Sequence, residues 1–225
     1  MYEFVQGEGI YLFDKKGKAY VDLISGIAVN NIGHHHPKVT KAIKRQVSKY
    51  SHQMVYGEYV IGPQVKLAKR LTKHLPKSLD SVYFLNSGSE AVEGAMKLAK
   101  KYTGRSKIVA MRNAYHGSTS GALSMMSDEY YSAPFKPLLP NIYFAEFNQT
   151  DSLDVIDSQT AAVFIEPIQA EKGYIPASFE FLNALRKKCN ETGTLLIFDE
   201  IQTGVGRTGK LYAFEHYEIT PDILL

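Results

Sequence analysis

The chain contains few of the features that would tie it to an oxidising compartment, a nucleic acid or a membrane. Cys189 is the single cysteine among 225 residues, so the sequence offers no disulfide framework and no cysteine-rich metal site. The 26 basic and 23 acidic residues give a net charge of only +3, which does not favour nucleic acid or an anionic membrane. No apolar run approaches the roughly 18 residues of a membrane-spanning helix, and the N-terminus lacks the apolar core of a signal peptide. We therefore expect a cytoplasmic protein that binds neither nucleic acid nor a membrane.

The length and composition are those of an ordinary globular protein. Hydrophobic residues make up 44% of the chain and charged residues 22%, which excludes disorder, collagen and coiled coil as descriptions of the whole chain. At roughly 150 residues per domain, the length predicts one large domain or two small ones. The chain closes on the apolar residues 223–225, whereas a natural C-terminus is more often polar, so we expect a piece of a longer protein.

Strand-like and helix-like segments alternate along most of the sequence. Continuous apolar strands separated by amphipathic helices predict an α/β fold with a mostly parallel central sheet covered by helices on both faces. In such sheets ligands bind at the C-terminal ends of the strands. The sequence predicts a hairpin within residues 10–21, helices at 37–50, 65–71, 90–102 and 179–190, and strands at 82–85, 108–111, 142–144, 161–165 and 194–198.

The first strand end carries the sequence Asn86-Ser87-Gly88-Ser89-Glu90. Ser87 followed three residues later by Glu90 is the signature of a capping box at a helix start. Gly88 lets a ligand approach the backbone, and the hydroxyls of Ser87 and Ser89 with the free N–H groups can hold a phosphate. A well-capped helix without a ligand explains the same residues. The lysine of a P-loop is missing, which argues against nucleoside triphosphate chemistry.

Aromatic and acidic side chains follow three other predicted strands. Tyr115 and His116 come after residues 108–111 and could cover a flat heterocycle, although a turn with a half-buried tyrosine is the alternative. Asp199 and Glu200 close a buried strand, and their alternation predicts that they point to opposite faces, with one of them at the site. Glu166 ends another buried strand. A structural ion pair is the alternative for each carboxylate, since buried acids are costly unless paired or used.

Two further patterns resemble binding motifs without meeting their requirements. Residues 204–209 match Gly-x-Gly-x-x-Gly, but the match does not follow its strand immediately and does not clearly open a helix, as a dinucleotide site requires. Residues 34–36 are three consecutive histidines, which point apart in a turn, so we expect no metal site.

A phosphate cradle, an aromatic cover and a buried strand-end carboxylate together fit pyridoxal 5'-phosphate, whose pyridine nitrogen needs an acid to keep it protonated. Five sequence blocks carry a resemblance to a known family: residues 25–37, 86–91, 113–117, 165–169 and 198–209. On these blocks the chain resembles the class III, fold-type I pyridoxal phosphate aminotransferases, which include acetylornithine, ornithine and 4-aminobutyrate aminotransferases. It is most similar to acetylornithine aminotransferase-like members.

The resemblance implies a role for each matching residue. Asp199 would pair with the pyridine nitrogen, Gln202 would reach the ring hydroxyl, and Glu166 would support the cofactor side of the site. Glu171 would correspond to a substrate-gating glutamate. Ser87, Gly88 and Ser89 would hold the cofactor phosphate. Tyr115 would stack on the ring, and His116 would lie beside it.

Three departures from the family pattern bear on the function. Ser118 stands where ornithine-type members carry a carboxylate-binding arginine, and Ala170 replaces a glycine in the gating loop. The Schiff-base lysine of the family lies beyond Leu225, and Lys172 and Lys210 do not match its segment. The resemblance therefore implies an incomplete large domain over residues 51–225, an N-terminal interface segment over 1–50, and an absent C-terminal small domain. This chain alone would lack turnover.

From these observations we predict an aminotransferase that moves an amino group between an amino acid and a 2-oxo acid. The donor would be acetylornithine, ornithine or another ω-amino acid, and the protein would be a homodimer. An amino-acid racemase or epimerase of the same family is the first alternative, because some such members also carry Tyr-His-Gly-Ser-Thr. A nicotinamide-dependent oxidoreductase and a non-catalytic cofactor-binding protein are the others.

Overall fold

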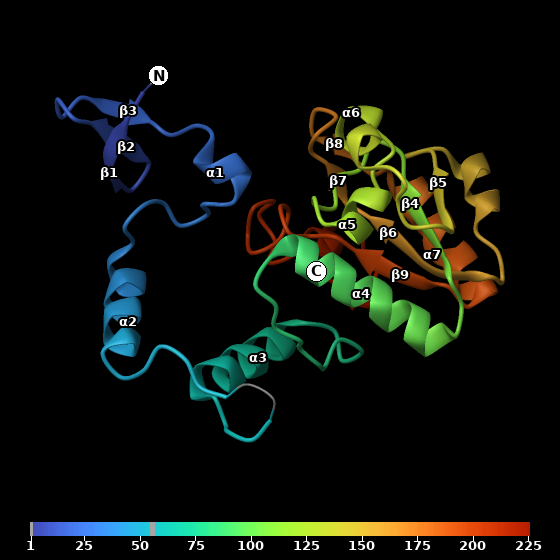
Figure 1. Cartoon of the computed structure of the whole chain (residues 1–225), viewed down its shortest axis with the longest axis horizontal. Helices are drawn as coiled ribbons and strands as arrows, with labels where there is room; N and C mark the ends of the chain where they lie inside the picture. Colours follow the sequence, from blue (N-terminus) through green and yellow to red (C-terminus); the bar gives the residue numbers. More distant parts are fainter. Residues whose placement is uncertain (1, 55–56) are drawn as a thin grey trace.

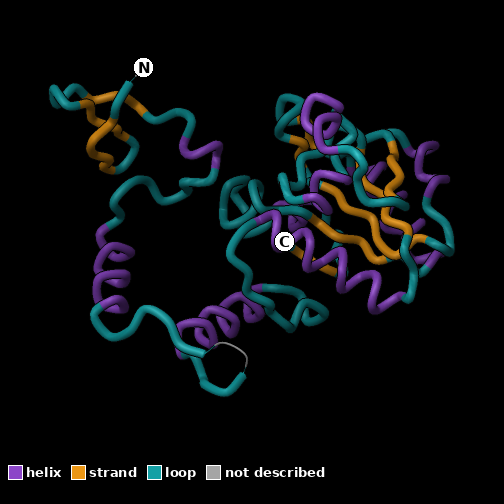
Figure 2. Tube along the Cα trace, viewed as in Figure 1, coloured by secondary structure: helices purple, strands orange, loops and turns teal. Residues whose placement is uncertain are grey.

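The computed structural model describes residues 2–54 and 57–225, and a five-stranded parallel sheet forms its centre (Figures 1 and 2). The strand order is β10-β9-β6-β4-β5, and every neighbouring pair is parallel. The strands are β4 (Lys107–Met111), β5 (Ile142–Ala145), β6 (Thr160–Ile165), β9 (Leu195–Phe198) and β10 (Ile223–Leu224). All parallel C-terminal ends meet at one edge of this sheet, which is where polar residues of the site were expected.

Helices cover both faces of the sheet, as the sequence predicted. Alternation along β6 directs Ala162 and Phe164 to one hydrophobic cluster and Val163 and Ile165 to the other. The first cluster includes residues of α4 (Gly88–Thr103) and the second includes residues of α7 (Phe179–Thr192). The continuous apolar strands are therefore buried on both sides, which confirms the predicted α/β class.

The start of α4 is fixed by the capping box that the sequence predicted. Ser87 Oγ accepts from Glu90 N–H at 3.2 Å, and Glu90 Oε2 accepts from Asn86 N–H at 2.8 Å. The carboxylate thus reaches one residue further back than in the usual box. The helix ends at Thr103 and is capped by Gly104, whose φ of 68° is left-handed and costs glycine little.

One predicted strand is wrong. Residues 82–85 belong to no strand, and Tyr83 is 80% exposed. A strand needs a neighbour that accepts and donates backbone hydrogen bonds, and no described segment pairs with these residues. The remaining predicted helices and strands are present, with ends that shift by a few residues. The predicted helix 37–50, for example, ends at Val47 as α2 (Pro37–Val47).

The N-terminal part lies beside the sheet rather than on it (Figure 1). It contains the antiparallel strands β1 (Phe4–Glu8), β2 (Tyr11–Asp14) and β3 (Ala19–Val21), which confirm the predicted hairpin, and the helices α2 and α3 (Gly62–His74). Between β3 and α2, the short element α1 (Ser25–Ala28) is a left-handed turn, because φ is positive at all four of its residues. The turn contacts the main body through the Gln202 side chain, which donates to Ile27 O, and Asn31, shortly after the turn, donates to Val205 O.

Short elements complete the fold around the sheet. They are α5 (Ser120–Ser124), α6 (Glu129–Ser132), η1 (Ala133–Phe135), η2 (Thr150–Val155), β7 (Ile168–Gln169), β8 (Ile175–Pro176) and η3 (Ala213–His216). Within the described residues, no helix combines the length and apolarity needed to cross a bilayer.

Candidate coenzyme site

A pocket of about 520 Å³ opens at the C-terminal ends of the central strands. Its wall combines the start of α4, the loop after β4, the ends of β6 and β9, and the left-handed turn α1. All nine predicted site residues line this one pocket: Ser87, Gly88, Ser89, Tyr115, His116, Glu166, Glu171, Asp199 and Gln202. The structure thus brings together side chains that are separated by more than a hundred positions in sequence.

The N-terminus of α4 forms an anion-binding corner of the pocket. The first-turn N–H groups of a helix have no partner within the helix, and they carry the positive end of its dipole. Gly88 allows Ile201 to pack closely against this corner, because a Cβ there would lie 2.8 Å from Ile201 Cδ1. Ser87 and Ser89 add hydroxyl groups on either side. The corner therefore has the donors and the space that a phosphate group requires.

A histidine and two carboxylates form a buried cluster that also lines the pocket. His116 Nδ1 lies 2.8 Å from Asp199 Oδ2, and both side chains are at most 5% exposed. Burial acts to lower the pKa of His116, but the hydrogen bond and charge of Asp199, helped by the charge of Glu166, outweigh it and raise the pKa. His116 Nε2 is buried without a hydrogen-bond partner among the described residues. The histidine therefore fixes one oxygen of Asp199 while a polar atom of its own is left unpaired.

Glu166 is tuned by the same cluster. Its Oε2 accepts the backbone N–H of Tyr115 at 3.0 Å. Burial raises the pKa of this carboxyl from 4.5 to about 7, although the nearby His116 and the Tyr115 N–H oppose the rise. A carboxyl that titrates near neutrality inside a pocket is typical of a functional site.

Two tyrosines line the pocket. Tyr115 is 40% exposed, and its ring meets that of Tyr131 edge-on with centroids 6.1 Å apart. The Tyr131 hydroxyl points at Glu171 Oε2 over 3.5 Å, which links α6 to the loop after β7. The sequence reasoning missed Tyr131, because its short helix shows no periodic pattern. The aromatic pair Tyr130-Tyr131 was the only available signal.

The adjacent acids at the end of β9 separate to opposite sides, as predicted. Asp199 faces the pocket, while Glu200 turns away and accepts hydrogen bonds from Thr203 Oγ1 at 3.1 Å and Phe214 N–H at 2.7 Å. Glu200 therefore serves to hold the turn before η3, and only Asp199 is available to a ligand.

Comparison with known proteins agrees with this geometry. The model of the family Aminotransferase class-III matches residues 1–225. The chain belongs to the class III aminotransferases. It is 46% identical over 220 residues to the LysW-aminoadipate semialdehyde/glutamate semialdehyde transaminase of Sulfolobus acidocaldarius, covering 98% of this chain and 56% of the relative. It is 44% identical to the acetylornithine aminotransferase of Methanopyrus kandleri, with the same coverage.

Solved structures confirm the fold. An ornithine aminotransferase from Toxoplasma gondii superposes with a TM-score of 0.90 at 31% identity, over 99% of this chain and 54% of that one. The family resemblance and the fold-type I architecture predicted from the sequence are thus confirmed. The chain spans a little more than half the length of the relatives it matches, between 54% and 56% in these three comparisons.

In this class III chain, Gln202 also makes a contact that the sequence did not predict. Its Nε2 donates to the backbone oxygen of Ile27 at 3.0 Å, which ties the end of β9 to the left-handed turn α1. The side chain still lines the pocket, and its Oε1 remains an acceptor. Ile27 and Val29 also line the pocket, although the sequence reasoning gave them no role. Their block, residues 25–37, was recognised only as a family match.

The Gly-x-Gly-x-x-Gly segment, residues 204–209, forms turns and opens no helix, so it is not a dinucleotide fingerprint. The backbone oxygen of Val205 in this segment accepts a hydrogen bond from Asn31 Nδ2 at 2.7 Å. The segment is therefore a loop that follows the Asp199 motif.

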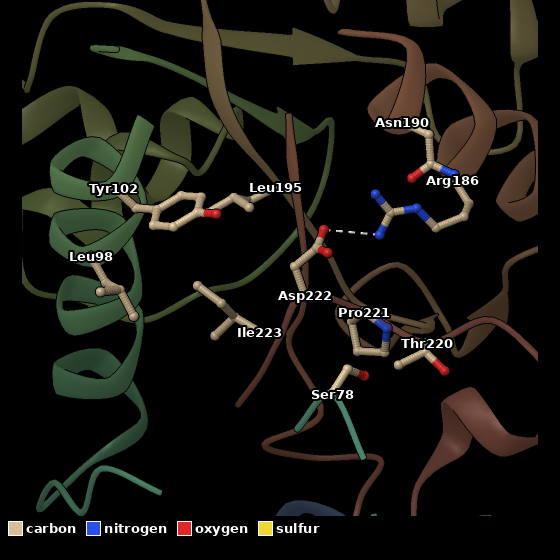
Figure 3. Close-up of a pocket in the computed structure, with 10 residues that line it drawn as sticks. All are labelled: Ser78, Leu98, Tyr102, Arg186, Asn190, Leu195, Thr220, Pro221, Asp222 and Ile223. Atoms are coloured by element: carbon tan, nitrogen blue, oxygen red, sulfur yellow. Dashed lines mark hydrogen bonds and ion pairs between the residues drawn. The ribbon is translucent and has the colours of Figure 1, made fainter. Parts of the chain in front are cut away.

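A second cavity of about 490 Å³ lies between α4, α7 and β10 (Figure 3). Its apolar wall includes Leu98, Tyr102 and Ile223, and its charged groups, Arg186 and Asp222, pair with each other at 2.9 Å. It contains none of the predicted site residues and no helix N-terminus, so the coenzyme site is assigned to the pocket at the strand ends.

Proposed function

We propose that this chain binds pyridoxal 5'-phosphate and forms the coenzyme-binding part of an aminotransferase. The observation that carries the proposal is the union, in one pocket, of an anion-binding helix start, an aromatic cover and a buried carboxylate. The residues present fit the coenzyme. Ser87, Gly88 and Ser89 line the pocket at a helix start, His116 Nε2 is a buried polar atom without a partner among the described residues, and Asp199 retains lone pairs.

Each residue has a distinct task in this proposal. Ser87, Gly88 and Ser89 would hold the phosphate, and Tyr115 would cover the ring. Asp199, oriented by His116, would keep a proton on the pyridine nitrogen. When bound, the coenzyme supplies an electron sink for the pair of electrons released at the substrate carbon.

The reaction would move an amino group between an amino acid and a 2-oxo acid. Relatives named for acetylornithine and for aminoadipate or glutamate semialdehyde support an ω-amino acid, or a derivative of one, as the donor. Glu171 and Tyr131, which line the pocket and lie 3.5 Å apart, would meet its distal end. Ser118 in place of a carboxylate-binding arginine keeps racemisation or epimerisation as the second candidate, which a chirality assay on the full-length enzyme would detect.

The location, domain division and assembly are also proposals. A cytoplasmic location agrees with the single buried cysteine. We assign residues 1–50 to an interface segment and 51–225 to the coenzyme-binding domain. The side chains of Val39, Ile43 and Val47 on α2 are between 42% and 62% exposed, an apolar stripe that a second copy of the chain would cover. Sedimentation of the full-length protein tests the homodimer.

The coenzyme proposal is tested with pyridoxamine 5'-phosphate, which carries an amine instead of the aldehyde and therefore does not condense with surface lysines. Since the chain contains no tryptophan, quenching of tyrosine fluorescence reports binding near Tyr115 and Tyr131. We expect saturable quenching, weaker binding of pyridoxamine without phosphate, and no competition by NADH. Asp199→Asn should lower the affinity at least tenfold, as expected for a lost charge-assisted hydrogen bond.

The matched control is Asp151→Asn, an exposed aspartate outside the pocket, which should bind like the unmodified chain. The proposal is refuted if pyridoxamine 5'-phosphate does not saturate, or if NADH displaces it.

A further inference from the structure

Two residues on one face of α4 accept hydrogen bonds from the loop that follows His116. Ser89 and Glu93 are four positions apart, so they lie one helical turn apart on the same face. Ser89 Oγ accepts the backbone N–H of Ser118 at 3.2 Å. Glu93 Oε1 accepts from Thr119 Oγ1 at 2.7 Å and from the Gly121 N–H at 2.8 Å. We call these contacts the α4–loop clasp.

Glycines on the loop make the close approach possible. Gly117 and Gly121 have the same spacing of four as the residues they meet. A Cβ at Gly117 would lie 3.1 Å from Ser89 Cα, and one at Gly121 would lie 2.7 Å from Glu93 Cδ. Gly117 also has a φ of +121°, which an L side chain rarely adopts. The fit therefore involves backbone as well as side-chain atoms, and it leaves the loop little room to shift against α4.

The clasp connects two walls of the pocket. The helix start that carries Ser89 is the anion-binding corner, and the gripped loop continues directly from Tyr115 and His116. The same oxygen, Glu93 Oε1, accepts the N–H groups of Gly121 and Ala122 in the first turn of α5, which have no partner within that helix. The carboxylate of Glu93 thus fixes the position of the aromatic cover relative to the phosphate corner.

We propose that Glu93 is a positioning residue that sets the spacing between the phosphate corner and the ring cover, so that one molecule contacts both. Glu93 does not line the pocket, so it acts through the α4–loop clasp. The proposal rests on the proposed coenzyme-binding function. Its specific consequence is that a ligand carrying both a ring and a phosphate depends on Glu93, whereas a ligand carrying only one of them does not.

The test compares three probes: pyridoxamine 5'-phosphate, pyridoxamine and inorganic phosphate. For Glu93→Ala we expect the dissociation constant of pyridoxamine 5'-phosphate to rise about tenfold, because the two half-sites are no longer preorganised. The constants for the two partial ligands should stay within about twofold, since each half-site remains. Glu93→Gln should bind like the unmodified chain, because its amide oxygen accepts the same bonds.

A second variant keeps the test independent of a folding defect. Thr119→Val removes one donor to Glu93 and should weaken pyridoxamine 5'-phosphate about threefold, and its effect should not add to that of Glu93→Ala. Lys97→Ala, one turn further along α4 on an exposed position, is the control and should change nothing. Amide exchange should rise at residues 117–122 in Glu93→Ala and stay unchanged in the central sheet.

Equal affinity of Glu93→Ala and the unmodified chain for pyridoxamine 5'-phosphate would overturn the inference while leaving the proposed function intact. An equal loss for all three probes would also overturn it, because Glu93 would then act on the whole fold. Failure of the unmodified chain to bind pyridoxamine 5'-phosphate would remove the proposed function and this inference together.

Discussion

Replacing Glu166 by glutamine should stabilise the coenzyme-free protein above neutral pH. Glutamine has nearly the same shape, and its oxygen can accept the Tyr115 N–H that Glu166 Oε2 accepts at 3.0 Å. The substitution removes only the charge that burial disfavours. Because burial raises the pKa of Glu166 from 4.5 to about 7, the folded protein binds this proton more tightly than the unfolded chain does.

The sign and size of the effect follow from that shift. The unmodified protein has the full benefit of the protonated carboxyl below pH 4.5 and loses it as the pH rises to about 7. At about 1.4 kcal/mol per pKa unit, the loss amounts to about 3 kcal/mol. Glu166→Gln does not lose this stability, because glutamine does not titrate. The two proteins should therefore be equally stable near pH 4 and differ by about 3 kcal/mol at pH 8.

Urea unfolding at pH values from 4 to 8, without coenzyme, measures the difference directly. Glu191→Gln, an exposed glutamate on α7, is the matched control and should shift stability by less than about 0.5 kcal/mol at every pH. Parallel stability curves for Glu166→Gln and the unmodified protein would refute the reasoning, since a pH-independent offset cannot come from titration of this carboxyl.

Two further predictions concern the core. Replacing Phe181, which is fully buried on α7, by alanine should lower the free energy of unfolding by about 3–5 kcal/mol. A loss below about 1 kcal/mol in urea unfolding would contradict the place of this side chain in the core. Burial raises the pKa of the Cys189 thiol from 9.0 to about 12, so Ellman's reagent at pH 8 should react with it only after unfolding. Rapid stoichiometric reaction of the native protein would show that the thiol is accessible.

Much of the fold was visible in the sequence because burial on two faces leaves a simple pattern. The run 161–165 has no polar position, which only a strand covered on both sides tolerates. Residues 82–85 carry the same kind of pattern but form no strand, because pairing depends on a neighbour that local sequence does not specify. The left-handed turn α1 was equally hidden, since three of its four residues are not glycine.

The site was predictable where side chains follow strands directly. Glu166 and Asp199 could be assigned to one edge of the sheet from parallel topology alone. Tyr131 and Ile27 reach the pocket from irregular segments, and their positions depend on long-range contacts such as the Gln202 bond to Ile27. The α4–loop clasp was missed for the same reason, because its two halves lie 29 residues apart at Ser89 and Ser118.

Asp199 and Glu200 point to opposite sides at the end of β9, so the strand cannot change its register there without losing the contacts of both. A slip of one position would turn every side chain of the strand to the other face. It would withdraw the Asp199 carboxylate from His116 and deprive Phe214 N–H of the acceptor that Glu200 supplies. The pocket contact of Asp199 and the loop contact of Glu200 therefore both depend on the same strand register. A one-residue deletion in this strand would remove both contacts at once, whereas a conservative substitution at either acid would remove only the contact of that acid.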